Sequence, residues 1–120
     1  MDKLSEAECR AMVELRDVPD AVKAGADRVA VILTQSWCMD WRVMRRYLQR
    51  LDEPGLALRW IEYDQEPLFA EILQLKEDVF QNRLIPYVRY YSGGELVNES
   101  NLVFFPGRFL AQFGGALHSD

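Results

Sequence analysis

The sequence has 120 residues, enough for one hydrophobic core and short for two, so we expect a single domain over residues 1–120. The net charge of −5 argues against a nucleic acid or an anionic membrane as partner. No apolar run approaches the roughly 20 residues of a membrane span. The first residues lack the basic start and apolar stretch of a secretory signal, so we expect a cytoplasmic protein.

Helical and strand patterns alternate along the chain. Ser5 followed by Glu8 is a capping-box pattern that marks the start of a helix. Residues 28–35 form a nearly continuous apolar run, which is typical of a strand buried on both faces. In chain order the patterns predict helices over 4–16 and 21–24, a strand over 28–35, a helix over 38–51, a strand over 56–63, a helix over 67–79, strands over 87–91 and 96–104, and a last helix from Pro106 to glycines 114–115.

The connections between these elements predict the sheet. A helix between the strands at 28–35 and 56–63 makes these two strands parallel. The stretch from Ser92 to Glu95, with two glycines, signals a hairpin between the last two strands. The order α-β-α-β-α-β-β-α therefore predicts an α/β fold with a mixed four- to five-stranded sheet and helices on both faces.

Cys38 lies where the first predicted strand gives way to a helix, in the stretch Trp37-Cys38-Met39-Asp40-Trp41. A helix N-terminus carries partial positive charge and free N–H donors, which favour a thiolate over a thiol. Asp40 opposes this effect, and Arg42 can offset Asp40. We expect the pKa of the Cys38 thiol to be lowered, but less than in a loop without an acid.

This order of elements, together with three local stretches, resembles the thioredoxin family over residues 21–113. Residues 31–38 look like the strand and active-site loop, residues 63–67 like the end of the next strand, and Ile85-Pro86 with residues 90–97 like the proline strand and its hairpin. The resemblance implies that Cys38 is the nucleophile and that the Ile85–Pro86 bond is cis. It also implies that the proline ring packs against the cysteine loop and that the backbone of Ile85 pairs with an extended peptide.

The sequence departs from the family pattern at three linked positions. Trp41 occupies the place of the second, resolving cysteine, and Ile32 and Trp60 occupy the places of a buried acid and a lysine. In the family, the acid is assigned to proton transfer at the resolving thiol. Because all three groups are missing together, we do not expect a dithiol disulfide reductase.

A single thiolate can still form a mixed disulfide, which an outside thiol must then release. We therefore expect monothiol exchange at Cys38 with a peptide or low-molecular-weight thiol partner, with glutathione as the candidate co-substrate and no resident cofactor. The glutathione-binding motifs of glutaredoxins are not evident, so the substrate stays open. The alternative is a redox-inactive module that holds an extended peptide in the same groove, and a third interpretation is a disulfide-linked homodimer of an otherwise monomeric or weakly dimeric chain.

Several further residues have competing interpretations. Trp37, Trp41 and Tyr87 could form an aromatic rim around Cys38, although Trp41 fits the core stripe of its helix equally well. Arg89, inside a predicted central strand, either pairs with a carboxylate such as Glu62 or marks a wetter end of the sheet. The remaining predictions assign Cys9 to the core, the arginines at 42, 45, 46 and 50 to a solvated surface, His118 to no role, and no residues to a metal site.

Overall fold

The most apolar segment of the chain forms the central strand of a five-stranded sheet. The computed structural model describes residues 1–114, and Gly115 and His118 lie outside them. Strand β2 (Arg28–Thr34) runs parallel to β3 (Leu56–Glu62) and antiparallel to β4 (Tyr87–Ser92). Strands β1 (Asp2–Lys3) and β5 (Glu95–Ser100) form the two edges, which gives the order β1-β3-β2-β4-β5.

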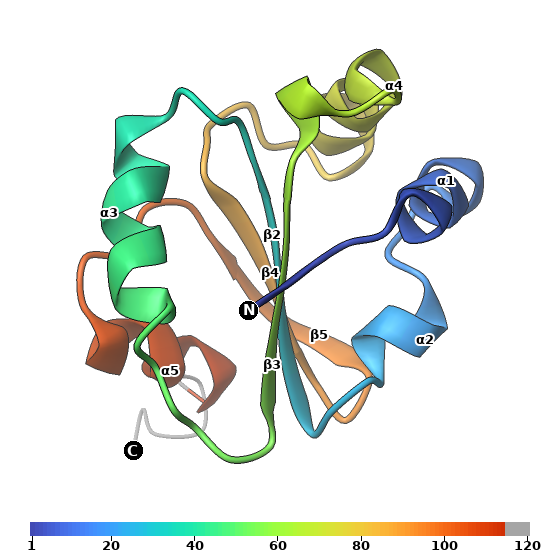
Figure 1. Cartoon of the computed structure of the whole chain (residues 1–120). Coiled ribbons are helices and arrows are strands. Elements are labelled where there is room, and N and C mark those ends of the chain that lie inside the picture. The colour runs from blue at the N-terminus through green and yellow to red at the C-terminus, as the bar shows by residue number, and fades with distance from the viewer. Residues whose placement is uncertain (115–120) are drawn as a thin grey trace.

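Helices cover both faces of the sheet (Figure 1). On one face lie α3 (Met39–Leu48) and α5 (Pro106–Gly114), and on the other lie α1 (Glu6–Leu15), α2 (Asp20–Lys23) and α4 (Phe69–Gln74). The predicted capping box of α1 is confirmed, because the Ser5 hydroxyl accepts from the Glu8 amide and the Glu8 carboxylate accepts from the Ser5 amide. Among residues 1–114, no helix has the length and apolar character needed to cross a membrane.

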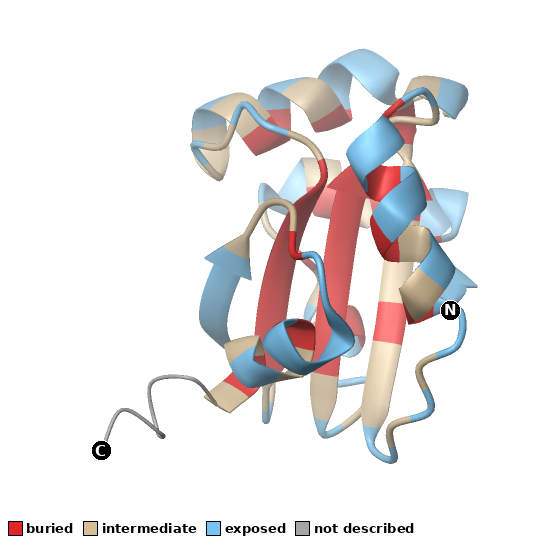
Figure 2. Ribbon diagram, turned by 90° about the vertical axis from the view of Figure 1, so that its left-hand side faces the viewer, coloured by how far each residue is buried: buried red, intermediate tan, exposed pale blue. Residues whose placement is uncertain are grey.

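Successive side chains of β2 pack into two separate cores, because they point to opposite faces of the sheet. Val31 and Leu33 pack with Cys9 in the core under α1, α2 and α4. Ile32 packs with Cys38 in the core under α3 and α5. The buried middle of the sheet in Figure 2 belongs to both cores, and the two cysteines therefore face opposite sides of the sheet.

The structure differs from the predicted elements in three places. Strand β1 was not predicted, because its two residues are exposed and carry no apolar pattern. The predicted helix over 67–79 is α4 followed by a π-helical turn, Leu75–Val79. The last strand ends at Ser100 rather than at 104, because Asn101 leaves the ladder and its side-chain amide donates to the Pro86 carbonyl over 2.9 Å.

Candidate functional site around Cys38

Cys38 is the N-cap residue of α3, with an extended backbone and no side-chain capping bond. Its carbonyl accepts the first helical hydrogen bond, from the amide of Arg42, over 3.2 Å. Within residues 1–114, the amide groups of Met39, Asp40 and Trp41 donate no hydrogen bond, as expected for a first helical turn. The sulfur therefore lies at the partially positive end of a helix with unused donors.

Asp64 fixes the loop in front of Cys38. Its carboxylate accepts a hydrogen bond from the Ser36 amide over 2.7 Å and another from the Gln65 side chain over 3.0 Å, and it also bonds the Ser36 hydroxyl. Burial alone would raise the pKa of Asp64, but the hydrogen bonds from Ser36 and Gln65 outweigh it and hold that pKa below its usual value. An ionised acid at the end of β3 thus anchors the turn that presents the thiol.

The start of β4 approaches the thiol from across the sheet. The Ile85–Pro86 peptide bond is cis, and Pro86 is buried. The Cys38 thiol donates to the Ile85 carbonyl, with 3.7 Å between Sγ and O. Within residues 1–114, the amide N–H of Ile85 makes no hydrogen bond. That amide is the kind of backbone donor with which an extended peptide can pair.

An open hollow of about 400 Å³ lies above the sulfur. Cys38 is only 5% exposed and forms its floor, whereas Trp37 and Leu84 are 63% and 64% exposed and form its sides. The other lining residues are Met39, Asp40, Arg83 and Ile85. Met39, Arg83 and Leu84 were not predicted, although each lies within two residues of a predicted site residue.

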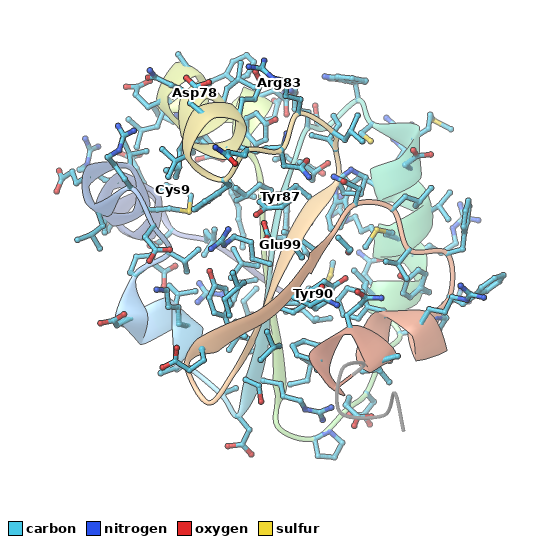
Figure 3. The ribbon with its side chains drawn as sticks, turned by 180° about the vertical axis from the view of Figure 1, so that it is seen from behind. Cys9, Asp78, Arg83, Tyr87, Tyr90 and Glu99 are labelled. Atoms are coloured by element: carbon cyan, nitrogen blue, oxygen red, sulfur yellow. The ribbon has the colours of Figure 1, made fainter. Side chains whose placement is uncertain are left out.

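The prediction that Trp41 and Tyr87 belong to an aromatic rim around Cys38 is wrong. Trp41 is fully buried and points into the core, where its indole N–H donates to the Glu62 carboxylate over 2.8 Å. Tyr87 is fully buried on the opposite face of the sheet, because β4 alternates and only Val88 and Tyr90 face α3 and α5. Figure 3 shows Tyr87 and Glu99 next to each other, with Tyr90 on the side of α5. Only Trp37 of the three borders the hollow.

The prediction that Arg89 pairs with a carboxylate is confirmed, but the carboxylate is that of Glu99 and not that of Glu62. Glu62 instead pairs with Arg45 and with the Trp41 indole. The Arg89 guanidinium donates to the hydroxyls of Tyr87 and Tyr91, each over 2.8 Å, and lies 3.5 Å from the Glu99 carboxylate. This cluster lies on the α1 face of β4, behind the sheet from Cys38. It plays no part in the hollow.

Asp40 and Arg42 are both exposed, and they form no ion pair within the described part of the chain. Asp40 lines the hollow above Cys38, whereas Arg42 lines a neighbouring hollow on the outer side of α3. Their predicted influence on the thiol stays a prediction. Among residues 1–114, no group of acidic, histidine or cysteine side chains is placed to bind a metal ion.

Solved structures of thioredoxins and glutaredoxins superpose on most of the chain. Thioredoxin O1 of Arabidopsis thaliana is 15% identical with a TM-score of 0.65, and the match covers 96% of this chain and 95% of that one. The thioredoxin of Malassezia sympodialis is 13% identical with a TM-score of 0.62, covering 100% and 92%. Glutaredoxin C1 of Populus tremula x tremuloides is 10% identical with a TM-score of 0.54, covering 89% and 94%. No protein-family model and no curated protein matches the chain.

This chain has a thioredoxin-like fold. The predicted α/β class is confirmed, and the sheet has five strands. The three residues at which the sequence departs from the family pattern lie close together in the structure. Ile32 and Trp60 are paired in the register of β2 and β3, and the Trp41 ring lies 6.2 Å from the Trp60 ring. Ile32, Trp41 and Trp60 therefore belong to one apolar cluster beneath α3.

The second cysteine of the sequence cannot replace the missing thiol. Cys9 is buried in the other core of this thioredoxin-like fold, and both cysteines are free. Burial raises the pKa of the Cys9 thiol to about 11, with smaller contributions from Glu66 and Glu8. The structure therefore assigns Cys9 to the core, in agreement with the sequence analysis.

Proposed function

We propose that the protein carries out thiol–disulfide exchange through Cys38 alone. The observation that carries this proposal is the sulfur at the floor of an open hollow, at a helix N-terminus and beside the Ile85 backbone. Reactive cysteines need such a partly accessible, electropositive environment. With Trp41 in the core and Cys9 behind the sheet, no second thiol of this chain can complete an internal cycle.

The exchange would proceed in two balanced steps. The Cys38 thiolate attacks one sulfur of a disulfide, the substrate S–S bond breaks as the new S–S bond forms, and the other sulfur leaves as a thiolate that takes a proton from water. A second thiolate, for which glutathione is the candidate, then attacks the mixed disulfide and releases Cys38. One disulfide is consumed and one is formed, so no outside oxidant is needed. A reducing compartment such as the cytoplasm would supply the releasing thiol.

The hollow offers a partner peptide both backbone and apolar contacts. An extended segment could pair with the unused amide of Ile85, as in strand addition to a sheet. Trp37 and Leu84 would cover its side chains, because exposed large apolar groups mark recognition surfaces. We therefore infer a peptide or small thiol as substrate, with Trp37, Leu84 and Ile85 as its binding residues. Pro86, which was also predicted to bind the substrate, is buried and does not line the hollow.

Exchange with a glutathione mixed disulfide of a small peptide tests the proposal. We expect mass spectrometry to find one adduct, on Cys38, that free glutathione removes. The variant Cys38→Ser should form no adduct, and Cys9→Ser should behave like the native protein. Absence of the adduct from the folded native protein would overturn the proposal.

A second candidate function is a redox-inactive module that holds an extended peptide. It is favoured by the 5% exposure of Cys38 and by the bond from its thiol to Ile85, which a thiolate could not donate. In that case the thiol should resist alkylation, and Cys38→Ser should keep full affinity for a peptide partner. Loss of affinity in Cys38→Ser would exclude this alternative.

A further inference from the structure

The outer side of α3 presents an exposed apolar row. Met39 and Val43 are 66% and 46% exposed, and Tyr47 follows at the same four-residue spacing. Residues four apart on a helix lie on one side of it. Exposed bands follow α3 in Figure 2, which views the molecule from the side of α3 and α5. This row begins at the hollow above Cys38, because Met39, its first member, also lines that hollow.

A row of arginines runs beside the apolar row. Arg42, Arg46 and Arg50 repeat every four residues, and all three are exposed. Among residues 1–114, none of them makes an ion pair or a side-chain hydrogen bond. Arg45, on the same helix, is different: it lies 3.4 Å from the Glu62 carboxylate and over the Trp60 ring. All four were predicted to belong to one solvated surface, whereas the structure separates one paired arginine from three unpaired ones.

Three hollows follow one another along these rows. The hollow above Cys38 shares Met39 with a second one of about 300 Å³. The second shares Val43 and Arg46 with a third one of about 330 Å³, which Pro106 closes. Phe104 and Phe105, immediately before Pro106, are 60% and 64% exposed. From residue 39 to residue 50 the surface extends about 16 Å, at 1.5 Å per helical residue.

The charge of this surface indicates which partner it fits. The whole chain carries 19 acidic and 14 basic residues, so three unpaired arginines in a row are a local exception. A long polyanion would meet repulsion from the acidic remainder of the surface. A short acidic segment would meet the three arginines, with Asp40 as the one acidic residue among those that line the three hollows. Its apolar side chains would cover Met39 and Val43. Such charge complementarity favours specificity and fast association.

We propose that the outer side of α3 docks an acidic segment of a partner protein that also carries apolar side chains. Its carboxylates would pair with Arg42, Arg46 and Arg50. Its apolar side chains would lie on the row of Met39, Val43 and Tyr47. This inference names the partner class of the Cys38 site and in that respect rests on the proposed function. Docking itself does not require the thiol.

Fluorescence anisotropy with a labelled synthetic peptide tests the proposal. The probe carries glutamates at every fourth position beside leucines, and two matched peptides carry glutamine or lysine instead. We expect the native protein to bind the glutamate peptide, with an affinity that falls as salt rises. Arg46→Glu/Arg50→Glu should lose roughly tenfold in affinity for it, as expected for two exposed ion pairs that become repulsive. The same variant should bind the lysine peptide better than the native protein does.

Matched variants separate this result from a general charge effect. Arg10→Glu/Arg16→Glu changes the net charge equally but lies on α1 and its C-cap, on the other face, and should keep the native affinity. Cys38→Ser should bind the glutamate peptide normally even if exchange is lost, which distinguishes failure of the two proposals. Equal binding of the glutamate and glutamine peptides would overturn this one. Tighter binding of a DNA duplex or of phosphatidylserine vesicles, or self-association abolished by Arg46→Glu/Arg50→Glu, would also overturn it.

Discussion

The regions around the two cysteines show how position in the fold separates two residues of one type. Cys9 lies inside α1 against the sheet, where burial raises the pKa of its thiol to about 11. Cys38 is almost as little exposed, but it caps α3 and forms the floor of a hollow. Exposure alone therefore does not distinguish the two thiols. The helix terminus and the open space above the sulfur do.

The two faces of the sheet also differ in the polarity of the side chains buried against them. On the face covered by α3, Ile32, Trp41 and Trp60 form an apolar cluster. Behind the sheet, Arg89 is buried among tyrosine hydroxyls and carboxylates. The side under α3 is apolar at this place, whereas the opposite side contains a buried charge. This contrast predicts different costs for mutations on the two faces.

The largest effect is expected under the thiol. Trp41→Ala should lower the free energy of unfolding by about 4 kcal/mol, because it leaves a large cavity in a dry core. Trp41→Phe should lower it by about 2 kcal/mol, mainly through loss of the bond to Glu62. Urea denaturation measures both, and the exposed Trp37→Ala is the matched control, with a change within about 0.5 kcal/mol. Equal costs for Trp41→Ala and Trp37→Ala would show that the apolar cluster does not hold this face.

On the other face, Arg89→Ala should lower the free energy of unfolding by about 3 kcal/mol, because it leaves the Tyr91 hydroxyl without its partner and removes the guanidinium from the Phe80 ring. Arg89→Met should cost less, since methionine fills most of the space. The same urea measurement decides the order. If Arg89→Met lowered the free energy of unfolding more than Arg89→Ala does, the lost side-chain volume would not explain the cost of Arg89→Ala.

The sequence predicted the fold because its signals were local. A continuous apolar run, a capping box and a glycine hairpin each depend on a few neighbouring residues, and β2, α1 and the turn at Gly93 follow from them. The edge strand β1 could not be predicted, because its ladder depends on Arg59 and Trp60, which are far away in the chain.

The candidate site was predictable in its centre and not in its surroundings. Cys38 and Ile85 were found from their neighbours in sequence, whereas the sides of the hollow depend on which side chains the fold brings together. Strand alternation could have excluded Tyr87, because it shares a face with Arg89 rather than with Val88. The position of Trp41 was ambiguous, because an aromatic side chain there suits both the rim around Cys38 and the core stripe of its helix.

The two thiols themselves should respond differently to replacement. Cys9→Ser should lower the free energy of unfolding by about 2 kcal/mol, because it places a hydroxyl in an apolar core. Cys38→Ser should cost less than about 1 kcal/mol, because serine is a favoured N-cap residue and can accept from the unused amides of α3. Thermal or urea unfolding compares them, and Cys9→Ala shows how much of the first cost is the hydroxyl. A larger cost for Cys38→Ser would contradict the N-cap assignment.

The smallest effect concerns the loop that presents Cys38. Asp64→Asn should lower the free energy of unfolding by about 1 kcal/mol at pH 7, because a charged acceptor of bonds from Ser36 and Gln65 becomes neutral. The pKa of Asp64 is lower in the folded protein than in the unfolded chain, so its contribution is present above about pH 4 and is lost as pH falls through the folded value. The difference between native protein and variant should therefore close in acid.

Urea unfolding at several pH values follows this difference, and Asp52→Asn, at an exposed acid outside the loop, should show no such closing. A difference between native protein and Asp64→Asn that stays constant down to pH 2 would assign the cost to shape rather than to charge. In Asp64→Asn the alkylation rate of Cys38 should change by a larger factor than that of Cys9, because Asp64 holds the turn before α3, whereas Cys9 is 1% exposed and reacts only when the fold opens. A larger factor at Cys9 would mean that the two faces of the sheet are not independent.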